Sequence, residues 1–128
     1  MAAENILVVD DEPVVGIAFQ RELCEKGYRV DSVLSGQEAL KGVQHKKYDL
    51  VFIDQHMPGM DGVETCREIK KLSPDSILIF MTGLFGKENV MKEQRFIEEG
   101  GRSYYLYKPF AQGELQKVAA KALGERSK

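Results

Sequence analysis

Residues 50–62 read LVFIDQHMPGMDG, and this stretch is the most informative about the fold. Its first four residues form a continuous apolar run, which is typical of a short strand buried on both faces of a parallel sheet. Asp54 follows that run directly, and a loop with Pro58 and Gly59 leads to a helix predicted over residues 61–72. The stretch therefore predicts a buried strand that ends on a carboxylate and is followed by a loop and a helix.

The same strand-then-helix unit recurs on both sides of this stretch. Further strands are predicted at residues 6–9, 28–32, 77–81 and 103–107, and further helices at residues 13–26, 35–45, within 87–99, and from 115 onward. Ser35 and Glu38 form a capping box at the start of one of these helices. Strands that alternate with helices indicate a parallel sheet with right-handed crossovers. The predicted fold class is α/β, a doubly wound (βα)5 three-layer sandwich.

Length, composition and charge exclude several classes of protein. The chain has 128 residues, of which 43% are hydrophobic and 30% charged, so we expect a single domain over residues 1–128. Its core is expected to run from about residue 4 to about residue 123. A formal net charge of −2 gives no basic surface for direct nucleic acid binding. No apolar run is long enough for membrane insertion and no signal region begins the chain, so we expect a cytoplasmic protein.

The two cysteines, Cys24 and Cys66, lie in separate predicted helices without metal-ligand spacing. Two buried, reduced thiols are therefore the expectation. Two methionines, Met57 and Met60, are expected to pack the loop after Asp54 rather than bind a metal.

Polar residues follow four of the five predicted strands. Asp10 and Asp11 follow the first strand, Asp54 the third, Thr82 the fourth and Lys108 the fifth. Ligands of open α/β sheets bind beyond the carboxyl ends of the strands, so these groups should converge. Three carboxylates at one point repel one another, and a divalent cation such as Mg²⁺, together with a lysine, would neutralise them. Such a site could also bind phosphoryl oxygens.

Four motifs carry a resemblance to a known family. They are VDDEP at residues 9–13, DQHMPGMDG at 54–62, Thr82-Gly83, and YLYKPF at 105–110. Over essentially its whole length the chain resembles the receiver domain of two-component response regulators, including chemotaxis regulators, which have a flavodoxin-like fold. The resemblance implies a five-stranded parallel sheet in the order 2-1-3-4-5.

The resemblance also implies a role for the acidic residues. Asp54 looks like the aspartate that is phosphorylated. Asp10 and Asp11 look like the acidic pair that holds Mg²⁺, together with Asp54 and the backbone carbonyl of His56.

Three further positions match family residues that act on the phosphoryl group. Lys108 would pair with the phosphoryl oxygens. Thr82 and Tyr105 match the switch pair, in which the hydroxyl of Thr82 bonds the phosphoryl group and Tyr105 turns inward. The implied chemistry is self-phosphorylation and self-dephosphorylation, not that of a conventional enzyme.

The implied partners act at two steps. A sensor histidine kinase or a histidine phosphotransfer protein would supply the phosphoryl group. A downstream effector domain or protein would read the face formed by the fourth helix, fifth strand and fifth helix, which is also the implied face for a homodimer. The segment from Thr82 to Lys108 is longer than the family pattern by roughly one helical turn, and Ala111 stands where a capping residue is common.

Three alternatives remain at this point. A phosphatase of the haloacid dehalogenase kind would need an acid two residues after its nucleophile, where this chain has His56. A flavodoxin-like FMN binder would need a phosphate loop after the first strand, where this chain has acids. An interaction module that is not phosphorylated would not need the intact set of Asp10, Asp11, Asp54, Thr82 and Lys108. The sequence also leaves open a free-standing receiver or a piece of a longer regulator or hybrid kinase, although we expect no DNA-binding or enzymatic effector within these residues.

Overall fold

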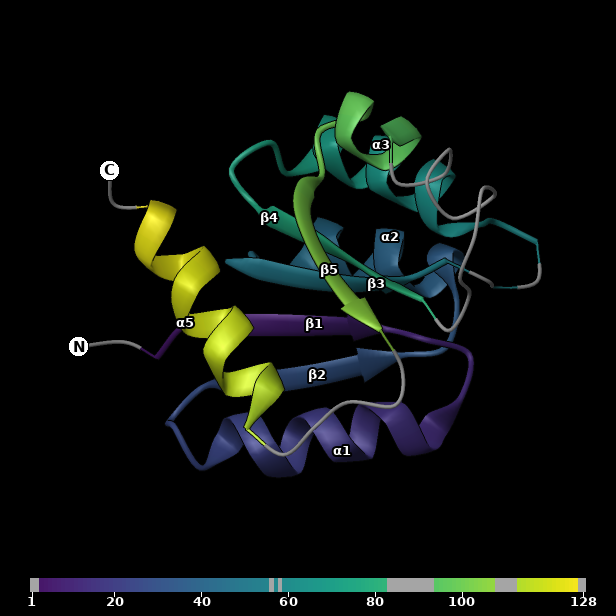
Figure 1. Cartoon of the computed structure of the whole chain (residues 1–128). Helices are drawn as coiled ribbons and strands as arrows, with labels where there is room; N and C mark the ends of the chain where they lie inside the picture. Colours follow the sequence, from purple (N-terminus) through teal and green to yellow (C-terminus); the bar gives the residue numbers. More distant parts are fainter. Residues whose placement is uncertain (1–2, 56, 58, 83–93, 108–112, 127–128) are drawn as a thin grey trace.

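The chain folds into one parallel sheet with helices on both faces (Figure 1). The computed structural model describes residues 3–55, 57, 59–82, 94–107 and 113–126, the side chains of 82, 102–107, 125 and 126 excepted. The strands are β1 (Asn5–Val9), β2 (Arg29–Val33), β3 (Leu50–Asp54), β4 (Ile77–Thr82) and β5 (Arg102–Tyr107). The helices are α1 (Pro13–Cys24), α2 (Gly36–His45), α3 (Gly62–Leu72) and α5 (Glu114–Arg126), and residues 94–98 are also helical.

The strand order is β2-β1-β3-β4-β5, and the four strand pairs are all parallel. The α/β class, the doubly wound arrangement and the predicted order 2-1-3-4-5 are therefore confirmed. Because the strands are parallel, their carboxyl ends meet at one edge of the sheet, at the arrowheads in Figure 1.

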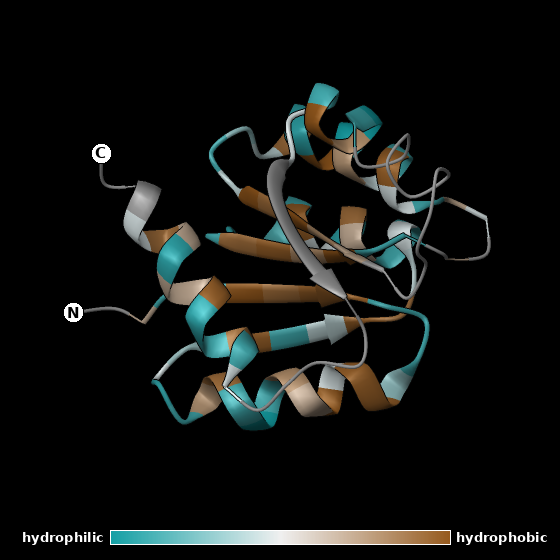
Figure 2. Cartoon of the chain, in the orientation of Figure 1, coloured by the Kyte–Doolittle hydropathy of each residue, from teal (hydrophilic) through white to brown (hydrophobic). Residues whose placement is uncertain are grey.

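Two apolar clusters pack the helices against the sheet, one on each face. Side chains alternate between the faces of a strand, so neighbouring residues of β3 enter different clusters. Phe52 joins the cluster under α1 and α5, where its ring meets Phe19 at a centroid distance of 4.9 Å. Val51 and Ile53 join the cluster under α2, α3 and residues 94–98. This double burial explains the unbroken apolar runs of the central strands, which stand out in Figure 2.

Local sequence signals fix several helix ends. Ser35 Oγ accepts a hydrogen bond from Glu38 N at 3.1 Å, as the capping box predicts. Glu38 Oε1 accepts a hydrogen bond from Leu34 N at 3.2 Å. The capping box predicts the amide of Ser35 as this donor, one residue later. Helix α1 ends at Cys24, two residues before the predicted end, because the chain turns into Gly27 with φ of 85°.

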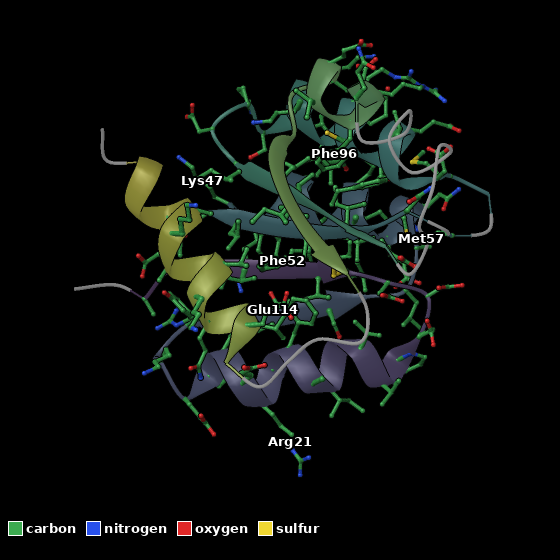
Figure 3. All side chains as sticks on the ribbon, viewed as in Figure 1. Arg21, Lys47, Phe52, Met57, Phe96 and Glu114 are labelled. Atoms are coloured by element: carbon green, nitrogen blue, oxygen red, sulfur yellow. The ribbon has the colours of Figure 1, made fainter. Side chains whose placement is uncertain are left out.

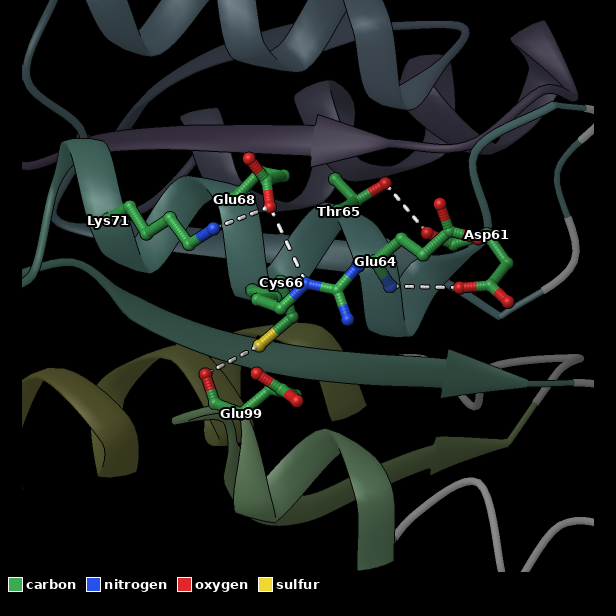
Figure 4. Close-up of polar contacts among 8 residues, drawn as sticks. Asp61, Glu64, Thr65, Cys66, Glu68, Lys71 and Glu99 are labelled. Atoms are coloured by element: carbon green, nitrogen blue, oxygen red, sulfur yellow. Dashed lines mark hydrogen bonds and ion pairs between the residues drawn. The ribbon is translucent and has the colours of Figure 1, made fainter.

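The two cysteines differ, and the prediction of two buried thiols is wrong for Cys24. Cys24 is exposed because it lies one position past Leu23, which ends the buried stripe of α1. Cys66 is buried on α3, and its Sγ lies 3.8 Å from Phe96 O. The same Sγ lies 3.6 Å from Glu99 O (Figure 4). Burial raises the pKa of the Cys66 thiol to about 12, so this side chain stays protonated and packs α3 against residues 94–98.

Candidate functional site

The site begins with the register of the central strands. β1 pairs with β3 so that Val9 lies opposite Ile53, and the next residues of the two strands are Asp10 and Asp54. β3 pairs with β4 so that Asp54 lies opposite Met81. The two carboxylates therefore leave the sheet from adjacent strands at what we call the carboxyl-end edge, defined by residues 10–12 and 54–55.

Three consecutive acids form a cluster at this edge. One carboxylate oxygen each from Asp10, Asp11 and Glu12 lies within 4.8 Å of the others. Asp10 is buried, with 2% of its surface exposed, whereas Asp11 and Glu12 are exposed. Asp10 Oδ1 also accepts a hydrogen bond from Glu12 N at 2.9 Å, which fixes the chain just before α1. The sequence prediction identified Asp10 and Asp11 but missed Glu12, although its place directly after them was a signal.

Asp54 is also buried, with 5% of its surface exposed. Burial disfavours the charged form of a carboxylate, and nearby carboxylates disfavour it further. A cation bound at this edge would offset both effects. Mg²⁺ prefers oxygen ligands and keeps several waters, so buried carboxylates beside the exposed Asp11 fit that ion.

The loop after Asp54 is held close to the sheet. Gln55 N donates to Met81 O at 3.0 Å, and Gly62 N donates to Gln55 O at 3.3 Å. A Cβ atom at Gly62 would lie 2.6 Å from Asp54 O, so only glycine lets α3 start this close to β3. Met57 is buried at the same edge (Figure 3), which confirms that it packs this loop.

Helix α3 begins from a polar cap. Asp61 Oδ1 accepts a hydrogen bond from Glu64 N at 2.9 Å, and Thr65 Oγ1 donates to Asp61 O at 2.8 Å (Figure 4). These bonds satisfy groups at the start of the helix, so the second aspartate of the 54–62 motif has a structural role.

The remaining predicted site residues are only partly described. The backbone of Thr82 ends β4 and pairs with Tyr107, and that of Tyr105 pairs with Phe80. Their side chains lie outside the described part of the chain, and so do His56, Lys108 and Ala111. Most of the lengthened segment between Thr82 and Lys108 lies outside it as well. Sequence reasoning did not single out Gln55, which is buried next to Asp54.

The similarity of this chain to known proteins identifies its family. The model of the response regulator receiver domain matches residues 6–120, which is most of the chain. The chain belongs to this family. The receiver domain is 34% identical over 111 residues to the transcriptional regulatory protein TcrA of Mycobacterium tuberculosis. That match covers 87% of this chain and 42% of TcrA, so the receiver domain spans less than half of this relative.

Solved structures agree with this assignment. The CheY-like receiver domain protein from Methanospirillum hungatei has a TM-score of 0.88 and 25% identity, and the match covers 98% of both chains. A response regulator protein from Burkholderia pseudomallei was crystallised with a phosphorylated aspartic acid, a calcium ion and citrate. Its TM-score is 0.81 at 25% identity, over 97% of this chain and 69% of that one. Among the described residues, no helix has the length and hydropathy needed to cross a membrane.

Proposed function

We propose that this receiver domain accepts a phosphoryl group on Asp54 as one step of a two-component phosphorelay. One observation carries the proposal: Asp54 is a buried carboxylate at the end of β3, at the same edge of the sheet as the buried Asp10 that follows the adjacent strand β1, within a chain that matches the receiver family. The family match over residues 6–120 supports treating residues 1–128 as one receiver domain.

The proposed reaction transfers phosphorus from nitrogen to oxygen. A carboxylate oxygen of Asp54 attacks the phosphorus of a phosphohistidine on the donor protein. The new P–O bond forms as the P–N bond breaks, and the imidazole leaves with the electron pair of that bond. The product is an acyl phosphate, which replaces a single carboxylate charge with a larger one.

The acidic cluster would serve this transfer by holding Mg²⁺. In the proposal Asp11 and Asp54 bind the ion through carboxylate oxygens, Asp10 binds it through a water, and the backbone carbonyl of His56 is a further ligand. When bound, Mg²⁺ stabilises negative charge on the transferring phosphoryl oxygens. The exposure of Asp11 supports the proposal because it leaves room for the waters that Mg²⁺ keeps, and the buried Asp10 is held in place by the hydrogen bond from Glu12 N.

Three residues would couple the phosphoryl group to the rest of the domain. Lys108 pairs with the phosphoryl oxygens, and the hydroxyl of Thr82 bonds them once the transfer is complete. Tyr105 then turns inward, so that the surface around β5 and α5 changes for an effector. A switch of this kind works only if the phosphoryl group contacts the two states differently.

The donor is proposed to be a sensor histidine kinase or a histidine phosphotransfer protein, and the surface beside the acids suits protein docking. Val14, Ile17 and Leu34 are large apolar side chains with exposed fractions of 65%, 55% and 44%. Val14 and Ile17 lie in the first turns of α1, directly after the acidic cluster, and Leu34 follows the carboxyl end of β2. Large apolar side chains exposed on segments that leave this edge of the sheet support a protein donor. A downstream effector or a second copy would use the face around β5 and α5.

Acetyl phosphate with Mg²⁺ tests the acceptor without a donor protein. We expect intact-mass analysis to find one added phosphoryl group, located on Asp54 and absent from Asp54→Asn. The matched control is Asp75→Asn, which removes an exposed carboxylate in the turn after α3 and should be modified like the wild type. An unmodified wild type would reject the proposal. Continuous phosphate release from many phosphomonoesters would favour a phosphatase instead.

A further inference from the structure

A buried side-chain amide lies next to the proposed acceptor. Gln55 has 1% of its surface exposed, and neither its Oε1 nor its Nε2 has a hydrogen-bond partner in the described part of the chain. Other partly buried glutamines of this chain do bond. Gln20 Nε2 donates to Val30 O at 3.2 Å, and Gln116 Nε2 donates to Glu22 O at 2.7 Å. Gln55 is therefore exceptional among these amides.

Backbone hydrogen bonds hold Gln55 in the interior. Its N–H donates to Met81 O and its carbonyl accepts from Gly62 N, so the residue is held between β4 and the start of α3. The alternation of β3 assigns residue 55 to the side of the sheet that carries Val51 and Ile53, which belong to an apolar cluster. An apolar side chain of similar length would suit such surroundings better than an amide.

A buried donor and acceptor without partners costs free energy, and native proteins rarely keep such groups without a function. The cost is tolerated if another state of the protein satisfies the amide. The alternation of β3 puts residues 54 and 55 on opposite sides of the sheet. Phosphorylation of Asp54 could nevertheless supply another state, because it would change the end of β3 and the neighbouring end of β4, whose pairing continues from Asp54 opposite Met81. The same event would shift Thr82, whose backbone follows Met81 in the strand that Gln55 N bonds.

We propose that Gln55 is a positioning residue of the phosphorylation switch, whose buried amide gains an oxygen partner only when Asp54 is phosphorylated. The partner is a phosphoryl oxygen or a hydroxyl that moves with it. The unsatisfied amide destabilises the resting domain, and its new hydrogen bond stabilises the phosphorylated one. This inference rests on the proposed function of Asp54.

Thermal unfolding with and without beryllofluoride and Mg²⁺ tests the proposal, because beryllofluoride mimics a phosphoryl group on aspartate. We expect Gln55→Met to raise the Tm of the resting domain by about 3–6 °C, since the variant no longer buries an unsatisfied amide. We expect the variant to bind beryllofluoride about tenfold more weakly, because it cannot make the new hydrogen bond. Gln55→Leu should behave in the same way and provides a second variant if methionine fails to fold.

A control variant separates a switch role from a structural one. Gln20→Met removes an amide that is already bonded, so it should lower the Tm equally with and without beryllofluoride. If Gln55→Met also changed both states equally, the switch role would be wrong. The double variant Gln55→Met with Thr82→Ala distinguishes the two oxygen sources: additive effects on beryllofluoride affinity indicate the phosphoryl group, and non-additive effects indicate the Thr82 hydroxyl.

The same experiment distinguishes the two proposals. Beryllofluoride binding to the wild type with an unchanged dissociation constant in Gln55→Met rejects the role of Gln55 and leaves Asp54 as the acceptor. A wild type that does not bind beryllofluoride rejects both.

Discussion

Buried polar groups lie at both ends of the sheet, but their surroundings differ. At the amino end, Ser76 Oγ donates to Tyr48 O at 2.5 Å and shares a hydrogen bond of 2.6 Å with Ser73 Oγ. At the carboxyl end, Asp10, Asp54 and Gln55 are buried beside exposed acids. The two serines find hydrogen-bond partners within the protein, whereas the carboxyl end brings several negatively charged side chains together. The serine network stabilises the fold at the first end, whereas the second end carries the proposed ligand site.

The amino-end network also holds a charged group. Lys70 Nζ donates to Ser76 O at 2.6 Å and to Pro74 O at 3.2 Å, so its ammonium covers the turn between α3 and β4. Figure 3 places Lys47 near this end of the sheet and Met57 at the other. Burial alone therefore does not mark a site. Buried polar groups become candidates for a ligand site where several ionisable side chains gather at the carboxyl ends of the strands.

The largest effect on stability is expected from breaking the serine network. Ser76→Ala leaves the Tyr48 carbonyl and the Ser73 hydroxyl without this partner in the interior, so the free energy of unfolding should fall by about 2 kcal/mol. Urea unfolding measures this change, and Ser32→Ala, at an exposed serine, is the matched control. Phosphorylation by acetyl phosphate should stay unchanged. A loss of phosphorylation would mean that the two ends of the sheet are coupled.

A smaller effect is expected from adding Mg²⁺ at the opposite end. Binding to the folded state alone, at ten times the dissociation constant, should add about 1.4 kcal/mol to the free energy of unfolding. The gain should disappear on chelation and be strongly reduced in Asp11→Asn, while Asp75→Asn keeps it. Equal gains in the wild type and Asp11→Asn would remove Asp11 from the proposed metal site.

The smallest effect concerns a carboxylate away from both ends. The Tyr48 hydroxyl donates a hydrogen bond to Asp31 Oδ2 at 2.6 Å, and Lys46 Nζ lies 2.9 Å from the same oxygen. Both interactions lower the pKa of the Asp31 carboxyl group. A lowered pKa in the folded state stabilises the protein above the ordinary pKa of the carboxyl group, and this contribution is lost as the pH falls through the lowered value. Because 48% of the Asp31 side chain is exposed, we expect only about 0.5 kcal/mol.

Comparison of the wild type with Asp31→Asn by urea unfolding tests this contribution. The difference in the free energy of unfolding should be present at neutral pH, shrink below about pH 4, and shrink further in high salt. A difference that persisted unchanged into strong acid would assign the effect of Asp31 to hydrogen bonds that do not depend on its charge.

Much of the fold follows directly from local sequence. The apolar run before Asp54 predicted β3 because a strand covered on both faces needs apolar side chains at consecutive positions. Ser35 predicted the start of α2 because its hydroxyl can accept from an amide three residues later. Tertiary packing decided other features. Cys24 is exposed and Cys66 buried, although both lie in helices with apolar stripes, because each cysteine's position relative to its stripe sets its exposure.

The candidate site likewise combines features that the local sequence predicts with features that depend on tertiary packing. That acids follow β1 and β3 could be predicted from the sequence, since a strand is expected to end where its apolar run stops. The sequence by itself also determined the family, through the motif at residues 54–62 and its spacing from the other motifs. Burial, in contrast, depends on tertiary packing. Gln55 loses contact with solvent because β4 and the start of α3 hold it, and that enclosure depends on contacts between segments far apart in the chain. Glu12 stays exposed, and its place in the acidic cluster depends on the backbone turn that its hydrogen bond to Asp10 Oδ1 fixes.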